Sequence, residues 1–454
     1  MSSSTDRLTG HVVRQHDPEY DAARTGWNQL YSKHPEAVAF CTDTTDVVNA
    51  LTWARHNRMP IRIRSGRHCL EGWSSLDGGL IIDVSGIKGA QIDAAAGTAT
   101  VGAGLNQLEA VTALGQAGLA AATGTEGSVG LVGATLGGGF GLLTRMLGMA
   151  SDNLLAAEIV IATPDGGASV ITASESENAD LLWALRGAGN GNFGIVTSLT
   201  YAVHPLTEAT YLTARWPGLD DLHDVFDAWQ RSAPYADHRL TSQLEIRQSD
   251  ITLVGALAAG SQHEATQMLD SILSVGAPQI TAETANWAQI YAGFQIPLDE
   301  EPANWKFLSQ FMSEPFPASA IDVIGDFMSR APTPECNYFT NAFGGAVTTS
   351  EPTGGSAFAH RDATFYAEPG AAWGRRGGVP ATDDPLTPHC LAWIAEFGAA
   401  LGPYADGAYV NVPNAGMPEW ETAYWGANVA RLRAVKAAYD PDGVFRFEQG
   451  LAHG

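Results

Sequence analysis

The chain has 454 residues, which is too long for one simple hydrophobic core and predicts two domains. Hydrophobic residues make up 45% and charged residues 16%, a composition typical of a globular protein and not of a disordered one. The 49 acidic residues outnumber the 25 basic residues, and the net charge of −24 disfavours nucleic acids and anionic membranes as partners.

Residues up to about 203 alternate between short strands and helices. In chain order we expect strands at 37–41 and 60–64 around a helix at 44–59, strands at 79–87 and 98–104, and a helix at 106–118. The first helix opens with threonine and aspartate, which are good N-cap residues, and the second is followed by glycine, which ends helices. This pattern predicts an α+β domain.

The texture changes between about residues 205 and 400. A strand is expected at 251–260 and a helix at 263–276, and proline-rich segments follow at 331–336 and 380–389. This stretch predicts a second domain. In the tail, residues 428–440 form an amphipathic helix, and we expect its basic side chains to lie on a solvated face, namely those of Arg431, Arg433 and Lys436.

The cysteines and the N-terminal residues carry little signal. None of Cys41, Cys69, Cys336 and Cys390 forms a CxxC pair, so neither a zinc site nor a disulfide framework is expected. The start MSSSTDRLTG lacks the charged and apolar regions of a signal peptide, and no apolar run approaches the length of a membrane span. We therefore expect a cytoplasmic protein.

Two glycine-rich stretches could carry chemistry, TGTEGSVGLVGATLGGGFGLLTR at 123–145 and GAGNGNFG at 187–194. Loops of this kind let backbone N–H groups surround a pyrophosphate. Neither is a Rossmann fingerprint, because neither places GxGxxG directly after a first strand. Each alone could be a structural turn. Together with the Ser65–Gly66 turn, they favour one extended cofactor that several loops bind.

The order of motifs is more specific than any one of them. RSGRH, GWS and GGLIIDVS are followed by GSVGLVGATLGGGFG, DNLLAAEIV and DLLWALRGAGNGNFGIVTSL, and the tail carries YVN and YWGANVARLRAVKAAYDPDGVFRFEQ. This set resembles the berberine bridge enzyme-like FAD-linked oxidases of the vanillyl-alcohol oxidase and p-cresol methylhydroxylase superfamily. The resemblance implies a two-domain α+β fold, with a discontinuous FAD-binding domain at 1–203 and 405–454 and a central substrate domain at 204–404 built on an antiparallel sheet.

The resemblance also implies a covalent flavin. His68 matches the histidine whose imidazole is bonded to the flavin 8α-methyl carbon; the alternative is a buried histidine satisfied by a hydrogen bond. Many relatives attach the flavin a second time through a cysteine, but Glu126 occupies that position and cannot form a thioether. We therefore expect a single histidyl-FAD link. Cys69 is expected to be a small buried residue, with a second attachment as the alternative.

Further FAD contacts follow from the same match. They are Arg64, Ser65, Gly66, Arg67, Cys69 and Ser74 at the pyrophosphate turn, then Gly124, Thr125, Ser128, Gly130, Gly133, Gly138, Gly139 and Gly141 along the diphosphate and isoalloxazine, and Ile195, Tyr409 and Asn411. Relatives usually have glycine where Arg67 stands, so Arg67 is either an extra cation for the phosphates or a solvated side chain. Val129 matches a small aliphatic residue that leaves oxygen a route to the flavin.

The catalytic base departs from the pattern. Several relatives carry a tyrosine directly after the tail asparagine, and here that residue is Val412, which accepts no proton. The candidates are Tyr338, Glu126 and His360, with Tyr338 first. Each has an alternative role: Tyr338 as a packed aromatic, Glu126 as an anchor of the glycine loop, and His360 as part of a structural His-Arg pair.

The reaction that the resemblance implies is oxidation of a small-molecule alcohol or amine, such as a secondary metabolite. A hydride passes to FAD, and molecular oxygen is reduced to hydrogen peroxide. Two alternatives are a flavin dehydrogenase that uses another electron acceptor and a resistance protein that binds a metabolite without turnover.

Overall fold

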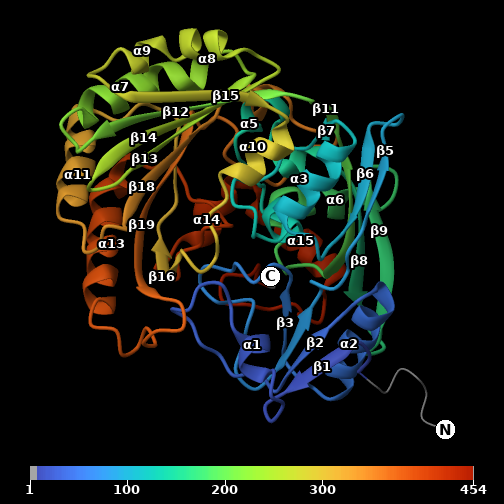
Figure 1. Cartoon of the computed structure of the whole chain (residues 1–454). Coiled ribbons are helices and arrows are strands. Elements are labelled where there is room, and N and C mark those ends of the chain that lie inside the picture. Colours follow the sequence, from blue (N-terminus) through green and yellow to red (C-terminus); the bar gives the residue numbers. More distant parts are fainter. Residues whose placement is uncertain (1–7, 453–454) are drawn as a thin grey trace.

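The computed structural model describes residues 8–452. Residues 1–7 lie outside the described residues. They are part of the N-terminal segment for which the sequence predicts no signal peptide. The chain builds three larger sheets and one two-stranded sheet. In Figure 1 the smallest of the three larger sheets lies at the bottom, a five-stranded sheet at the right and the largest sheet at the upper left.

The first sheet contains the strands expected at the start of the chain. Its order is β1-β2-β4-β3, with β1 (His11–Arg14), β2 (Ala37–Phe40), β4 (Leu80–Asp83) and β3 (Ile61–Arg64). Helix α1 (Tyr20–Arg24) follows β1, and α2 (Thr44–His56) crosses from β2 to β3. The side chain of Asp43 caps α2 by accepting a hydrogen bond from the backbone N–H of Asp46. Strand β4 is buried along its whole length, as a parallel strand with neighbours on both sides requires.

The second sheet is antiparallel, in the order β5-β6-β10-β8-β9. Its strands are β5 (Ala90–Asp93), β6 (Thr98–Gly102), β10 (Ile195–Ala202), β8 (Leu154–Ala162) and β9 (Ala168–Ser174), and the two-stranded sheet pairs β7 (Leu119–Ala120) with β11 (His204–Pro205). The helices between them are α3 (Gln107–Gln116), α4 (Leu131–Leu136), α5 (Thr144–Leu147) and α6 (Ala179–Ala188). A capping box between Asn106 and Glu109 starts α3 where the sequence predicts it.

The central part of the chain forms the eight-stranded antiparallel sheet. Seven strands follow the order β15 (Gln279–Ala285), β12 (Ala209–Pro217), β14 (Asp250–Ala258), β13 (Leu240–Ile246), β18 (Asn337–Ala342), β19 (Phe365–Arg375) and β16 (Pro302–Phe307), and β17 (Gln310–Met312) pairs with β19. The helices are α7 (Leu222–Ser232), α8 (Gln262–Met268), α9 (Asp270–Leu273), α10 (Trp287–Gly293), α11 (Ala318–Ser329), α12 (Ala346–Thr349) and α13 (Thr387–Leu401). The single helix expected at 263–276 is two short helices that meet at Leu269.

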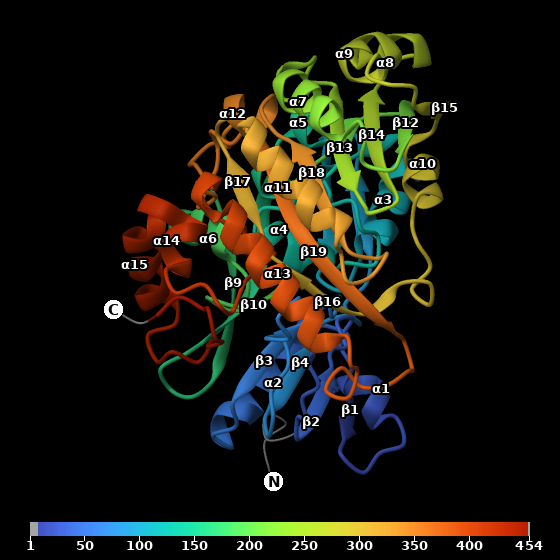
Figure 2. The ribbon, with the colours of Figure 1, turned by 90° about the vertical axis from the view of Figure 1, so that its left-hand side faces the viewer.

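Helices α11 and α13 cover one face of this large sheet, whereas α10 packs against the other face at β12 and β14. Figure 2 shows α11 and α13 lying over the first face, and their apolar side chains join those of β13, β14, β18 and β19 in one core cluster. Because side chains alternate along a strand, every second residue of these strands points the other way. That other face looks toward the glycine-rich segments in Figure 1.

The tail returns to the N-terminal part of the fold. Helices α14 (Trp420–Trp425) and α15 (Val429–Tyr439) place Trp425, Leu432 and Val435 in the same core cluster as the β2 and β8 strands. Residues far apart in sequence therefore share one core, as Figure 1 shows by the red helices beside green and cyan segments.

The expectation that Lys436 lies on a solvated face is wrong. Its side chain is 1% exposed, and its Nζ donates to the backbone oxygens of Asn192 and Phe445 and to Oδ2 of Asp440, at 2.5, 2.7 and 2.5 Å. The physical reason is helical periodicity, since position 436 lies one turn after Leu432 and shares its buried face.

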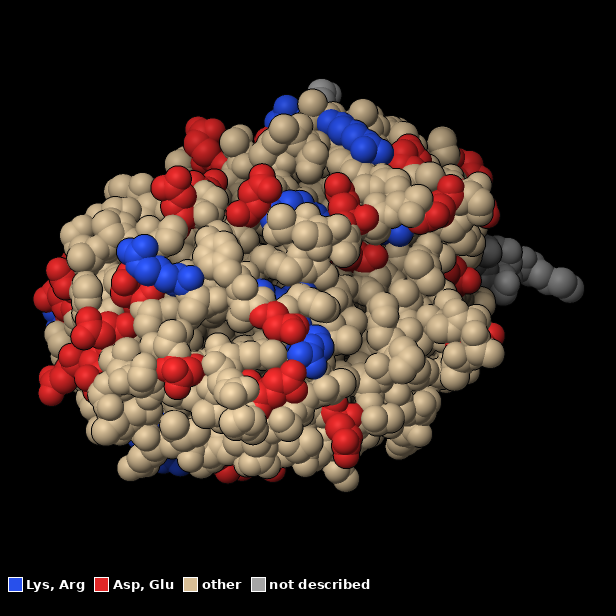
Figure 3. Space-filling view, turned by 90° about the horizontal axis from the view of Figure 1, so that it is seen from above, with Lys and Arg blue, Asp and Glu red and all other residues tan. Residues whose placement is uncertain are grey.

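The acidic balance of the sequence is visible at the surface. On the face seen from above in Figure 3, aspartate and glutamate side chains predominate over lysine and arginine side chains. Among the helices built from residues 8–452, none is both long enough and apolar enough to cross a membrane.

Candidate active site

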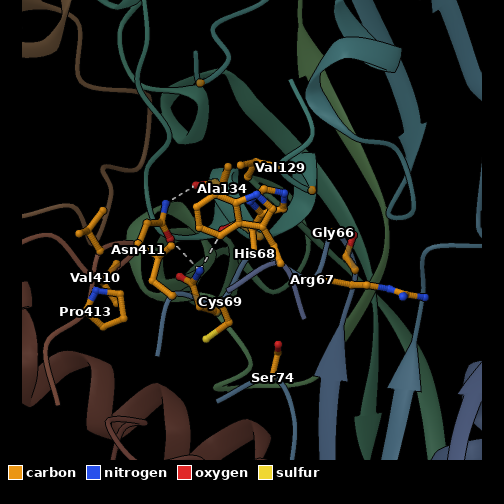
Figure 4. Close-up of a pocket in the computed structure, with 18 of the residues that line it drawn as sticks. Gly66, Arg67, His68, Cys69, Ser74, Val129, Ala134, Val410, Asn411 and Pro413 are labelled. Carbon is orange, nitrogen blue, oxygen red and sulfur yellow. Dashed lines mark hydrogen bonds between the residues drawn. The ribbon is translucent and has the colours of Figure 1, made fainter. Parts of the chain in front are cut away.

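One cavity of about 580 Å³ lies between the glycine-rich segments, the tail and the large sheet, on the sheet face opposite α11 and α13. This volume is within the range of small-molecule sites. Residues from segments 65–74, 124–139 and 190–196 line it on one side, and residues of β13, β16, β18 and β19 line it on the other. Figure 4 shows the part around His68, Val129 and Asn411. The flavin region that the sequence predicts and the large sheet therefore line the same cavity.

Two of the predicted glycine turns touch each other at Gly66 and Gly130. A Cβ on Gly66 would lie 2.1 Å from the backbone nitrogen of Gly130, so no larger residue fits there. Gly133, by contrast, lines the cavity, and a Cβ on it would meet no protein atom within 4 Å. Backbone that is stripped of side chains beside open space is what a dinucleotide needs for close approach. The residues present therefore fit the FAD that the sequence implies.

Most of the predicted FAD contacts lie at this cavity. Those that line it are Arg64, Ser65, Gly66, Arg67, His68, Cys69, Ser74, Gly124, Thr125, Val129, Gly130, Gly133, Gly139, Tyr409 and Asn411. Ser128 is not among the residues that line the cavity, but it contacts His68, which is. Gly138 and Gly141 shape the loop instead, because Gly138 has φ +129° and a Cβ on Gly141 would lie 2.4 Å from the oxygen of Thr123.

The placement of Ile195 corrects the prediction by one residue. Its side chain is fully buried in the core, whereas Gly194 and Val196 line the cavity. The reason is the alternation of side chains along β10, which the sequence match does not resolve.

The two predicted arginines, Arg64 and Arg67, make their polar contacts with protein groups. Arg64 is buried, and its Nε donates to Oδ2 of Asp83 at 2.7 Å. Arg67 has φ +64°, a conformation that favours glycine. Its Nη1 donates to the oxygen of Ala22 at 3.0 Å and its guanidinium lies over the Phe40 ring. Figure 4 shows this side chain directed away from His68 and Asn411, which does not support a role as an extra phosphate-binding cation.

His68 is held in a defined orientation at the cavity. Its ring stacks on Trp27, with the ring centroids 4.8 Å apart, and its Nε2 lies 3.0 Å from the Oγ of Ser128. Burial, with the nearby positive charge of Arg376, lowers the pKa of His68 to about 3. The imidazole is therefore neutral, which is the form with a lone pair available for bonding to carbon.

Glu126 also lines the cavity, and it contacts the same serine. Its Oε1 accepts hydrogen bonds from the Oγ and the backbone N–H of Ser128, at 2.9 and 3.2 Å. The glycine loop is further held from the large-sheet side, where Oε1 of Gln295 accepts from the N–H of Gly127 at 2.6 Å.

The tail residues tie the glycine-rich segment to the cavity. The Tyr409 hydroxyl accepts hydrogen bonds from the N–H of Gly139 and from Nδ2 of Asn411, at 2.7 and 2.8 Å. Nδ2 of Asn411 also donates to the oxygen of Ala134 at 2.8 Å, as Figure 4 shows. The next residue, Val412, lines the cavity with an apolar side chain.

The geometry removes Tyr338 from the candidate bases. Along β18, Asn337 and Phe339 line the cavity, whereas Tyr338 points to the opposite face, where its ring packs 5.6 Å from that of Phe397. His360 is likewise buried away from the cavity lining, with its ring stacked on Phe311 at 4.2 Å.

The sequence reasoning missed Glu368. This residue of β19 lines the cavity, and the Tyr366 hydroxyl donates a hydrogen bond to its Oε2. Burial raises the pKa of the Glu368 carboxyl to about 7. Tyr366 in turn packs on Phe140, which contacts Tyr409, so this carboxyl lies beside the tail and the glycine-rich segment. The available signal was one isolated carboxylate in the apolar strand FYAEPGAAWG.

The rest of the wall on the large-sheet side is aromatic and has paired charges. Its aromatic residues are Trp305, Phe307 and Phe339. Arg247 forms a 2.8 Å ion pair with Glu245, and Arg376 forms a 3.2 Å ion pair with Glu301. Among residues 8–452, Glu126 and Glu368 form no ion pair with a basic side chain.

Sequence and structure comparisons agree over nearly the whole chain. Family models described as FAD binding domain and as berberine and berberine like match residues 35–168 and 408–452. FAD-linked oxidoreductase YgaK of Bacillus subtilis (strain 168) is 37% identical over 448 residues, or 98% of this chain and 97% of that protein. (R)-6-Hydroxynicotine oxidase of Paenarthrobacter nicotinovorans is 37% identical over 199 residues, 44% of this chain and 42% of that protein. The solved structure of Physcomitrella patens BBE-like 1 matches with a TM-score of 0.89 at 25% identity, covering 98% of both chains.

Proposed function

Because the chain belongs to the family of berberine bridge enzyme-like FAD-linked oxidoreductases, we propose that it is an oxidase of small-molecule alcohols or amines, such as secondary metabolites. In this proposal a hydride leaves a carbon that bears oxygen or nitrogen, and molecular oxygen is reduced to hydrogen peroxide. The observation that carries it is the single cavity in which the glycine-rich loops face the Glu368 carboxyl. The predicted α+β fold and the assignment as an FAD-linked oxidoreductase are confirmed by these matches.

Glu368 is the proposed base. A carboxyl with a pKa of about 7 is part ionised at neutral pH and takes a proton from a substrate hydroxyl or ammonium group efficiently. The Tyr366 hydroxyl fixes its orientation. Bound FAD supplies the two-electron acceptor for the hydride. Segments 65–74 and 124–139 and the pair Tyr409 and Asn411 are the residues that would hold it.

The wall on the large-sheet side suggests which substrates fit. Aromatic side chains of Trp305, Phe307 and Phe339 favour a planar apolar body, and the Glu368 carboxyl favours a positively charged or neutral group beside it. An alkylamine that carries an aromatic ring has both properties. The match to a hydroxynicotine oxidase supports the same class, since that name denotes an aromatic compound with an amino nitrogen.

The function is tested by mixing alkylamines and alcohols that carry an aromatic ring with the yellow protein in the absence of oxygen. We expect at least one of them to bleach the flavin, and admission of air to restore the colour with one peroxide formed per substrate consumed. Bleaching with little peroxide in air would instead indicate a dehydrogenase with another acceptor. Tight binding without bleaching would indicate a binding protein.

We further propose that FAD is attached covalently through His68 alone. The neutral, oriented imidazole supports this link, and the carboxylate of Glu126 forms no thioether. Acid-precipitated wild-type protein is then expected to stay yellow, and His68→Ala protein to give a colourless precipitate. His16→Ala, which changes an exposed histidine, is the matched control and should retain the colour. A colourless wild-type precipitate would contradict the link.

A further inference from the structure

A hydrogen-bond relay joins His68 to Glu126, and we infer that this relay drives the attachment of FAD to His68. In it, Glu126 acts through Ser128 as the acceptor of the proton that the imidazole loses. The inference rests on the proposed link at His68. It assigns a task to the carboxylate that stands where relatives carry the cysteine for their second attachment.

The direction of the relay follows from its donors and acceptors. The Ser128 hydroxyl donates to Oε1 of Glu126 at 2.9 Å, because a carboxylate can only accept. The Ser128 oxygen is then free to accept from Nε2 of His68, 3.0 Å away. The hydrogen of the neutral imidazole is thus on Nε2, and the lone pair is on Nδ1. The relay therefore selects Nδ1 as the atom that bonds to the flavin.

The surroundings keep the imidazole in this orientation. The stack on Trp27 fixes the ring plane, and Trp27 is itself held, because its Nε1 donates to Oε2 of Glu301 at 2.6 Å. Arg376 also contacts Trp27, with its guanidinium 5.5 Å from the ring centroid. The charged or titratable groups that act on this cluster are Glu126, Tyr291, Glu301 and Arg376. Of these, Glu126 is the one that His68 reaches through a hydrogen-bonded hydroxyl.

The attachment step balances with these groups. Nδ1 of His68 forms a bond to the 8α carbon of FAD, and that carbon loses one proton. The electron pair of the broken C–H bond enters the isoalloxazine ring and the released proton is taken up by the same ring, which is thereby reduced by two electrons. The Nε2 proton of His68 passes to Ser128 while the Ser128 proton passes to Glu126. Molecular oxygen then takes two electrons and one proton from the reduced ring and the second proton from Glu126, yielding hydrogen peroxide, the oxidised, linked flavin and a Glu126 carboxylate.

The test follows attachment itself and needs no substrate. Full-length wild-type, Ser128→Ala and Glu126→Gln proteins are produced under riboflavin limitation, and FAD is then added. The covalent fraction is read over time from acid precipitates and from intact mass, and total bound FAD is read from absorbance before acid treatment. We expect both variants to bind FAD but to form the link about 100-fold more slowly. Ser128→Thr and Glu126→Asp, which keep the hydroxyl and the carboxylate, should recover most of the rate.

The pH dependence separates a relay from simple loop support. In Glu126→Gln the proton must leave to solvent, so its linking rate should rise steadily with pH, whereas the wild-type rate should be flat between about pH 6 and 9. Equal linking rates in wild type and both variants would overturn the relay. Loss of FAD binding before acid treatment in both variants would also overturn it and assign the two residues to loop support. If wild-type protein forms no link at all, the proposed attachment fails, and not the relay alone.

Discussion

Replacing Glu368 with glutamine is expected to slow anaerobic flavin reduction by about 10²–10⁴-fold, the usual contribution of a general base. Glutamine keeps the size of the side chain and can still accept the hydrogen bond from the Tyr366 hydroxyl. It cannot take a proton from the substrate. The measurement is stopped-flow bleaching of the flavin with a substrate found by the anaerobic screen.

The pH profile gives a second readout of the same residue. Because burial raises the pKa of Glu368 to about 7, its carboxyl is protonated and inactive as a base below that pH. The wild-type rate should therefore rise as the pH increases through about 7, and this limb should be missing from Glu368→Gln.

Two controls distinguish lost chemistry from lost structure. A carboxyl whose folded pKa is raised favours folding at low pH and disfavours it as the pH rises through the folded pKa. Glu368→Gln should therefore unfold at no lower temperature than wild type at about pH 8. Glu335→Gln changes an exposed carboxylate that pairs with Arg247 from outside the cavity lining, and it should leave the rate unchanged. A Glu368→Gln rate within a factor of a few of wild type would remove Glu368 as the base.

Replacing Lys436 with methionine is expected to lower the free energy of unfolding by about 3–5 kcal/mol. The Lys436 ammonium and the Asp440 carboxylate are both buried, and without the lysine the carboxylate remains as an uncompensated buried charge. The backbone oxygens of Asn192 and Phe445 lose their donor as well. Urea unfolding followed by tryptophan fluorescence gives the change.

A control on the same helix tests whether burial is the cause. Arg433 pairs with Glu421 at the exposed surface, so Arg433→Met should cost less than about 1 kcal/mol. The double variant Lys436→Met with Asp440→Leu should recover part of the loss, because it leaves no buried charge. A loss of less than about 1 kcal/mol in Lys436→Met would show that the ion pair contributes little.

The sequence by itself determined two kinds of feature in this protein, namely local secondary structure and the order of the motifs along the chain. The helices expected at 44–59 and 106–118 form as Thr44–His56 and Gln107–Gln116, although their N-caps are Asp43 and Asn106, which were not predicted as caps. The order of the glycine motifs indicated the family and the flavin region. Gly66 and Gly130 belong to these motifs, and the structure adds that their two loops approach each other too closely for a side chain.

The tertiary structure alone decided which side chains face the cavity. Tyr338 and Ile195 were named at the right strands, but a strand presents alternate residues to opposite faces, and which face is the inner one depends on distant segments. Glu368 became the candidate base, and Lys436 a buried cation, through the same long-range packing. A carboxyl or an ammonium acquires an unusual pKa or an obligatory partner from desolvation by residues far away in sequence, and a local pattern contains no information about that burial.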